Sequence, residues 1–343
     1  MIDPPLRLRL DGDALVANWR WLADKSGSAA CGAAIKADGY GLGARGVFDR
    51  LVVAGCRDFF VATWGEAEAL GPLPEGVSLS VLHGVRVEDM AFAIGAQARP
   101  TLNTAEQVMR WKAAGGGACD VMIDTGMNRL GLCVADVADG LLDGLQIETL
   151  MSHLASADEN VAQNVAQQEN FAALRRKTSA RRMSLANSAG ICLGSNYAFD
   201  LTRPGLALYG GTPRSEAAGY IAQVAYPEAQ ILQRRTVLVG ESVGYNATFT
   251  ATKNMELAIL NLGYADGYLR GFSGKGAADG GRFPVIGRVS MDLIAVCVDA
   301  DPALCEGDWL TLDYDLPAAA AASGLSQYEL LTGLGDRSIR RWT

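Results

Sequence analysis

The feature that most constrains the fold of this chain is an alternation of short apolar runs with amphipathic segments over its first two-thirds. Such an alternation is typical of buried parallel strands joined by helices. Eight runs are predicted as strands: Cys31–Lys36, Phe59–Thr63, Leu79–His83, Gln97–Leu102, Asp120–Asp124, Ile147–His153, Met183–Asn187 and Phe199–Arg203. The helices predicted between them include Ala44–Ala54, Thr104–Ala114 and Asn160–Ser179. The pattern favours an α/β fold with a (β/α)8 TIM-type barrel, and a doubly wound sheet is the alternative.

The pattern changes near Ile221. Strand-like segments separated by glycine-rich turns follow: Arg235–Val239, Met255–Leu262, Val285–Val289 and Asp292–Val298. The next predicted helix is Ala318–Leu331. The length of 343 residues also favours two domains. We therefore predict a barrel over residues 11–225 and a mainly β domain over 226–343. The early run Leu6–Leu10 lies outside the eight-strand count, so the strand within residues 1–10 is expected to join the C-terminal sheet.

The charge balance and the cysteines narrow the class of protein. The 30 basic and 38 acidic side chains give a net charge of −8, which argues against a nucleic-acid partner. No uncharged apolar stretch approaches the ~20 residues that span a bilayer, and the first residues lack a signal-peptide pattern. The seven cysteines form no Cys-x-x-Cys pair, and there are only two histidines, His83 and His153. A reduced cytoplasmic enzyme without a metal centre is predicted.

Lys36 ends the first predicted strand. Active sites of barrel enzymes lie at the carboxyl ends of the strands, and an unpaired buried ammonium group is costly, so this position favours a chemical role. A lysine at the rim with its amine in water is the alternative. The glycines of Gly41-x-Gly43-x-x-Gly46, with Glu66 about twenty residues further on, also match a dinucleotide-binding fingerprint, but the first glycine lies too far past the strand for a good match.

The segment Ile35–Gly41 closely resembles the pyridoxal-phosphate lysine motif of alanine racemases. The other motifs of that family follow in the family's order: Asp124–Gly131, Ser152–Ala155, Asn187–Ala189, Arg203–Gly210, Val243–Thr248, Gly263–Gly267 and Gly287–Asp292. The resemblance covers nearly the whole chain. It implies an isomerase on a barrel followed by a β domain, which interconverts L-alanine and D-alanine with pyridoxal 5'-phosphate and supplies D-alanine for peptidoglycan. It also implies a homodimer with shared active sites.

The resemblance implies two bases on opposite faces of the substrate α-carbon. Lys36 would hold the cofactor and act as one base, and Tyr245 matches the second. A phenol near its reference pKa of ~10 is a poor base at neutral pH, so it needs a neighbour. His153 matches the family residue that links this tyrosine to the arginine at the cofactor.

The cofactor's other contacts follow from the same resemblance. Arg203 matches the arginine that faces the pyridine nitrogen, and because a guanidinium keeps its proton, that nitrogen would stay unprotonated. The backbone N–H groups of Gly205 and Leu206 and the hydroxyls of Ser188 and Tyr40 are expected to bind the phosphate. Barrel enzymes commonly bind phosphate after strands seven and eight, where Ser188 and Gly205 fall.

Substrate contacts are also implied. Arg129 matches the arginine that binds the cofactor's phenolic oxygen and the substrate carboxylate, and Met291 would offer its backbone N–H to that carboxylate. Four further residues match those that line the narrow path to the active site in the family: Tyr264, Arg270, Arg288 and Asp158. Two positions depart from the family. Met122 replaces a lysine that is carbamylated in many members and orients the arginine, and Asp336 falls where a phosphate-contacting tyrosine is common.

Three alternatives to an alanine racemase stay open. A racemase for another amino acid, such as serine or lysine, would use the same chemistry. A non-catalytic pyridoxal-phosphate carrier would resemble the single-domain barrel relatives, but those lack a β domain. The assignment as a nicotinamide dehydrogenase would rest on the spacing of Gly41, Gly43 and Gly46 alone. A few pocket side chains decide substrate range, and these cannot be read from one sequence.

Overall fold

The computed structural model describes residues 3–343. It divides into two compact units, and each is described by itself. The barrel unit comprises residues 16–208 and 212–221, and the β unit comprises the chain up to Leu15 together with residues 209–211 and 222–343. No helix within residues 3–343 is both long enough and apolar enough to cross a membrane.

The barrel unit is built on parallel strands. They are β2 (Ala30–Cys31), β3 (Ala33–Ala34), β4 (Asp58–Val61), β5 (Ser78–Val81), β6 (Arg99–Leu102), β7 (Cys119–Met122), β8 (Ile147–Met151), β9 (Arg182–Ser184) and β10 (Leu201–Thr202). Strands β3 to β9 pair in chain order, and β10 pairs with β2. The ring closes because Asp200, just before β10, donates its N–H to the carbonyl of Met183 in β9, 3.0 Å away. All eight predicted strands occur in order, with β2 and β3 together forming the first, so the predicted barrel is confirmed.

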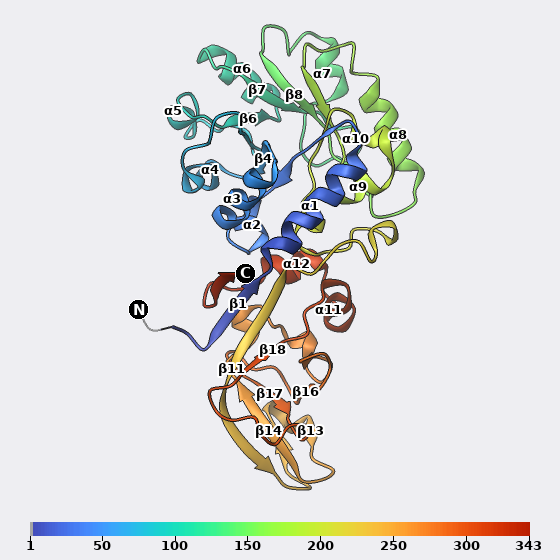
Figure 1. Ribbon diagram of the computed structural model, residues 1–343. Helices are drawn as coiled ribbons and strands as arrows, with labels where there is room; N and C mark the ends of the chain where they lie inside the picture. Colours follow the sequence, from blue (N-terminus) through green and yellow to red (C-terminus); the bar gives the residue numbers. More distant parts are fainter. Residues whose placement is uncertain (1–2) are drawn as a thin grey trace. The chain divides into compact units, whose positions relative to one another are not determined.

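Helices follow the strands around the barrel unit (Figure 1). They are α1 (Gly12–Ser26), α2 (Lys36–Tyr40), α3 (Ala44–Ala54), α4 (Trp64–Leu70), α5 (Met90–Ala93), α6 (Ala105–Ala113), α7 (Val134–Ala138), α8 (Ala162–Ala172), α9 (Ser188–Cys192) and α10 (Ser195–Ala198), with 3-10 turns η1 (Leu206–Tyr209) and η2 (Ser215–Ala217). Helix α3 has the predicted bounds. Helix α8 ends earlier than the predicted Ser179. Thr104 accepts the N–H of Gln107 and starts α6, as an N-cap threonine does.

The interior of the barrel is unusually polar. The Asp58 carboxylate accepts hydrogen bonds from Arg182, at 2.6 and 3.0 Å, and from Ser78 at 2.8 Å. Asp120 is fully buried, accepts the Ser80 hydroxyl at 2.6 Å and lies 3.6 Å from the Arg99 guanidinium. Barrel interiors are usually filled by branched apolar side chains. Because buried charges are stable only when paired and hydrogen-bonded, this network is an electrostatic support inside the barrel.

The β unit contains a twisted eight-stranded sheet. Its strands and two additional short strands are β1 (Leu6–Leu10), β11 (Ala225–Val237), β12 (Ser242–Val243), β13 (Phe249–Thr250), β14 (Met255–Leu260), β15 (Ala277–Ala278), β16 (Phe283–Ile286), β17 (Ile294–Cys297), β18 (Trp309–Thr311) and β19 (Ile339–Trp342). Strand β1 pairs antiparallel with β11 and parallel with β19. The long strand β11 also pairs with β14 and β18 (Figure 1). Three 3-10 turns, η3 (Tyr245–Ala247), η4 (Tyr264–Asp266) and η5 (Arg270–Phe272), lie in its loops.

Three predictions for the β unit were wrong in their bounds. The predicted strand Val285–Val289 overlaps β16, which ends at Ile286, in only two residues. The predicted strand Arg235–Val239 is only the end of β11, which starts ten residues earlier and contains Pro227, a residue that weakens any strand prediction. The single predicted helix Ala318–Leu331 is two helices, α11 (Leu316–Ser323) and α12 (Gln327–Thr332). Gly324 has a left-handed φ of 77° and ends the first, and the Ser326 hydroxyl caps the second.

Candidate active site

Lys36 stands at the carboxyl end of the first barrel strand, as predicted, and begins a left-handed turn. The four residues that follow it all have φ between 52° and 62°, and three of them, Ala37, Asp38 and Tyr40, are not glycine. Such a conformation is costly for residues with a Cβ and persists only when the surroundings impose it. The turn fixes the direction in which the lysine side chain leaves the strand.

The barrel unit brings positive charges together around a neutral histidine. The pKa of Lys36 is lowered by burial and by the nearby charges of Arg129 and Arg203. Burial and the same three cations lower the pKa of His153 to about 3. His153 is therefore uncharged at neutral pH, and the three cations form an electropositive cluster in a chain whose net charge is −8. Such a cluster favours an anionic ligand with several negative groups.

Arg203 is buried and held by the barrel wall. One guanidinium nitrogen, Nη1, donates to the hydroxyl of Ser184, and Nη2 donates to the carbonyl of Ser152 at 2.6 Å. Burial lowers the pKa of Arg203 to about 10, while the Asp120 carboxylate acts in the opposite direction. The guanidinium therefore keeps its proton at neutral pH. A ring nitrogen placed against it would meet a fixed positive charge.

The groups that are expected to bind phosphate, called the cradle below, lie after the last two barrel strands. The Ser188 hydroxyl oxygen accepts the N–H of Gly205 at 3.0 Å and that of Ala207 at 3.2 Å. Both of its lone pairs are then used, which leaves the O–H proton to donate to a ligand. A Cβ on Gly205 would lie 2.2 Å from the Tyr40 hydroxyl, so any larger residue there would require the Tyr40 ring to move. The polar groups present fit the expected pyridoxal phosphate, with Leu206 next in the same turn.

The loop that carries Arg129 is organised by Asp124. One oxygen of this carboxylate accepts the N–H groups of Gly126 and Met127 at 2.8 and 2.9 Å, and the other accepts that of Arg129 at 3.0 Å. These N–H groups lower the pKa of Asp124. Met122, one of the two positions that depart from the pattern of the resembled family, is buried at the end of β7. The backbone of Arg129 is thus held by Asp124, and its exposed side chain is available to an anion.

In the β unit, Tyr264 and Met291 lie in adjoining loops. Tyr264 donates its N–H to the carbonyl of Ser290, and Ala265 donates to that of Met291, both at 3.0 Å. The Arg270 guanidinium lies 5.2 Å from the Tyr264 ring. Arg337 ties the two loops together, because it contacts Asp266 at 2.8 Å and Asp292 at 2.7 Å. Asp158, also predicted on the path to the site, belongs to the barrel unit.

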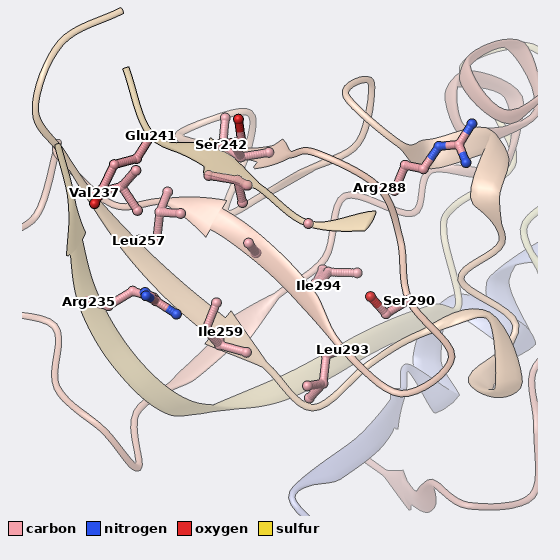
Figure 2. A pocket seen from close by; sticks show the side chains of 14 residues that line it. Arg235, Val237, Glu241, Ser242, Leu257, Ile259, Arg288, Ser290, Leu293 and Ile294 are labelled. Carbon is pink, nitrogen blue, oxygen red and sulfur yellow. The ribbon is translucent and has the colours of Figure 1, made fainter. Parts of the chain in front are cut away.

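Tyr245 lies on a loop of the β unit and is 63% exposed. This loop contacts the loop of Arg288, since a Cβ on Gly287 would lie 2.8 Å from the carbonyl oxygen of Val243. Beside them is a cavity of about 350 Å³ with an apolar floor and two arginines, Arg235 and Arg288, in its wall (Figure 2). Gly244, the residue before Tyr245, is among the residues that line this cavity.

Sequence reasoning missed three residues that organise the site. Glu66 had a place only in the dinucleotide alternative, but its carboxylate accepts backbone N–H groups of its own helix start and of Ala37. Arg337 was passed over because its two partners are distant in the sequence. Asp336, which falls where a phosphate-contacting tyrosine is common in the resembled family, is fully exposed and lies 3.9 Å from Arg340. Asp124 stood in a matched motif, but only the structure reveals its three N–H partners.

Fold and site together define a barrel enzyme in which a lysine at the strand ends faces an anion-binding cluster and a phosphate cradle. The comparisons with known proteins identify the family. The description "Alanine racemase, N-terminal domain" matches residues 10–213, and "Alanine racemase, C-terminal domain" matches residues 224–342. The chain belongs to the alanine racemase family.

Individual relatives agree with this assignment. An alanine racemase of Acidiphilium cryptum (strain JF-5) is 40% identical over 97% of each chain. The crystal structure of alanine racemase from Bartonella henselae with covalently bound pyridoxal phosphate is 33% identical, with a TM-score of 0.90 and coverage of 98% of this chain and 99% of that one. The biosynthetic alanine racemase of Pseudomonas aeruginosa is 31% identical over the whole of both chains, with a TM-score of 0.88.

Proposed function

We propose that this chain interconverts L-alanine and D-alanine with Lys36 and Tyr245 as the two bases. The chain is an amino-acid racemase with pyridoxal phosphate as its cofactor, and the relatives give no support to serine or lysine as the main substrate. The observation that carries the assignment of the site is the cluster of Lys36, Arg129 and Arg203 around a neutral His153, next to the Ser188 cradle.

The residues of the barrel unit divide the work of binding. The hydroxyls of Ser188 and Tyr40 and the backbone N–H of Leu206 would hold the phosphate. The N–H of Gly205, which donates to the Ser188 hydroxyl oxygen in this structure, would have to exchange that partner for the phosphate. Bound pyridoxal phosphate withdraws electrons from the α-carbon of the amino acid and so acidifies its hydrogen. Arg203 keeps its proton, so it would not donate that proton to a ring nitrogen held against it, and the withdrawal of electrons would be limited accordingly.

The substrate and its proton would be handled by groups from both units. Arg129 would bind the substrate carboxylate, to which the backbone N–H of Met291 would also donate, and Tyr264 would line the path to the substrate. Lys36 would remove or return the proton on one face, since its lowered pKa increases the fraction of free amine near neutral pH. Tyr245 would serve the other face, with His153 as its link to Arg203.

The direct test is turnover by the purified chain. With pyridoxal phosphate present, L-alanine should yield D-alanine, read by chiral chromatography, while L-serine and L-lysine should give far slower conversion. Borohydride should fix the cofactor on Lys36, located by peptide mass. Conversion of serine or lysine faster than that of alanine would reject alanine as the substrate, and a label on another lysine would reject the site.

We further propose a homodimer in which Tyr245 of one copy completes the site of the other, in the cytoplasm, with D-alanine destined for peptidoglycan. The exposure of Tyr245 and of Met291, 63% and 53%, supports a surface that a second copy covers. A two-fold arrangement makes both sites equivalent. Mixing inactive Lys36→Ala with inactive Tyr245→Phe should restore part of the activity as subunits exchange, because some heterodimers regain one intact site. No recovery, with heterodimers demonstrated, would place both residues in one chain.

A further inference from the structure

Glu66 divides its carboxylate between two backbone segments. It lies in the first turn of α4, and its Oε2 accepts the N–H groups of Ala62 at 2.6 Å and Thr63 at 3.3 Å. These bonds complete a capping box, because the Thr63 hydroxyl accepts the N–H of Glu66 in return. The other oxygen, Oε1, is not needed for the cap. It accepts the N–H of Ala37, the residue directly after Lys36, at 2.8 Å.

The segment that Glu66 reaches needs outside support. Ala37, Asp38 and Tyr40 are held at φ of 53°, 52° and 56°, in the region that L-residues other than glycine rarely adopt. The far end of this turn is fixed by Asp38, whose carboxylate accepts the N–H of Ala44 at 2.8 Å. The near end, next to the lysine, is fixed by Glu66. A conformation of this kind persists only when such contacts over-determine it.

The charge of Glu66 also matters for the lysine. Arg129 and Arg203 both place positive charge near Lys36, and both lower the pKa of its amine along with burial. Glu66 acts in the opposite direction and raises it. An acid close to a lysine favours the ammonium form, so loss of the acid should favour the free amine.

We propose that Glu66 is a positioning residue for Lys36: it anchors the left-handed turn that sets the direction of the lysine side chain, and it offsets the positive charge around the amine. The proposal rests on the proposed function in one respect, that Lys36 carries the cofactor. It also gives a role to the acidic residue whose spacing mimics a dinucleotide fingerprint. In this fold its oxygens are committed to backbone N–H groups rather than to a ribose.

Three variants separate the contributions of the helix cap, the negative charge of Glu66 and the length of its side chain. Thr63→Ala removes the cap hydroxyl and leaves the bond to Ala37 in place. Glu66→Gln keeps the length of the side chain but removes its charge, and it can accept from only one of the two segments, because its amide oxygen accepts and its NH2 group does not. Glu66→Asp keeps the charge but is too short to bridge both segments. Each full-length variant is freed of cofactor and reloaded with pyridoxal phosphate, and covalent attachment at Lys36 is followed by absorbance from pH 6 to 10.

The expected results differ among the variants. In Glu66→Gln the midpoint of the pH profile for attachment should fall by about half a pH unit or more, because the acid no longer favours the ammonium form. In Glu66→Asp the midpoint should change less, but the rate at the optimum should fall roughly 10-fold, because the lysine is displaced. Thr63→Ala should lower the melting temperature while the midpoint and the rate stay at wild-type values.

Two results would overturn the proposal. One is that neither Glu66 variant changes the midpoint or the rate. The other is that Thr63→Ala changes them as much as Glu66→Gln does, since Glu66 would then act only as a helix cap. If Glu66→Gln fails to fold, as judged by circular dichroism, the rate of cofactor attachment in Glu66→Asp decides whether the proposal stands. Failure of the wild-type chain to attach the cofactor at Lys36 would instead contradict the proposed function, so the two failures are distinguishable.

Discussion

The buried cofactor residues predicted in the barrel unit and the exposed residues predicted in the β unit differ in how firmly the chain holds them; the side chain of Arg129, in the barrel unit, is exposed like those of the β unit. In the barrel unit Arg203, Ser188 and Tyr40 are less than 10% exposed, and Arg203 and Ser188 have named hydrogen-bond partners at their functional atoms. In the β unit Tyr245 and Met291 are more than half exposed.

This difference separates two tasks. Charged and polar groups buried in a low-dielectric setting need fixed partners, and once fixed they bind an anion with little reorganisation. The barrel unit should therefore determine cofactor binding. An exposed phenol on a loop is neither dehydrated nor oriented until another surface covers it. The β unit should therefore determine which face of the substrate exchanges its proton, and only in the assembled enzyme.

The largest expected effect comes from the barrel unit. Lys36→Ala should abolish covalent attachment of the cofactor and lower turnover by at least about 10³-fold, since it removes both the attachment point and one base. The chain should stay folded, because the variant removes a cation that lies among two others. Borohydride reduction followed by peptide mass spectrometry checks attachment, and thermal melting checks the fold. A reducible cofactor retained by the variant would show that another lysine carries it.

The second-largest effect is expected at Tyr245, the exposed second base in the β unit. Tyr245→Phe removes one hydroxyl from an exposed ring, so thermal stability should be unchanged. Exchange of the α-hydrogen of L-alanine with deuterated solvent should fall by about 10²- to 10⁴-fold, while exchange from D-alanine should fall much less. Nuclear magnetic resonance of each enantiomer in turn provides the measurement. Equal losses for both enantiomers would remove the two-base assignment.

The barrel could be predicted from the sequence because its signals are local. Apolar runs mark the strands, and Lys36 at the end of the first run indicates where chemistry can occur. The predicted run Phe199–Arg203 is correct in place but too long, since Phe199 has a left-handed φ of 53° and β10 is only Leu201–Thr202.

The support of the site could not be predicted in the same way. The bond from Ala37 to Glu66 spans 29 residues, and that from Arg337 to Asp266 spans 71. Such partners depend on how loops meet in space, and no periodicity reports them. Resemblance supplied the roles of Arg203 and Tyr245. It said nothing of the carboxylates that hold the lysine turn, because those contacts are visible only in the fold.

A smaller effect should come from crowding the phosphate cradle. In Gly205→Ala the new methyl group would lie 2.2 Å from the Tyr40 hydroxyl, so the ring must move away from the phosphate position. We expect affinity for pyridoxal phosphate to fall roughly 10-fold, equivalent to about 1.4 kcal/mol. Equilibrium titration of the cofactor-free chain measures it. Gly117→Ala is the matched control, because no atom lies within 4 Å of its added Cβ. Equal affinity in both variants would remove Gly205 and Tyr40 from the cradle.

The smallest expected effect concerns His153 in the cofactor-free chain. Because burial and three cations lower its folded-state pKa to about 3, the unfolded chain binds more protons between that value and the ordinary pKa near 6.5. The contribution of this residue to stability is therefore fully present above pH 6.5 and is lost as the pH falls. Between pH 7.5 and pH 5.5 the loss should be about 1 kcal/mol. Urea unfolding at the two pH values measures it. His153→Gln should reduce the difference by that amount. If the loss of stability between the two pH values is the same in His153→Gln as in the wild type, burial and the three cations do not lower the pKa of His153. The site in the barrel unit would then be less firmly organised than its contrast with the β unit implies.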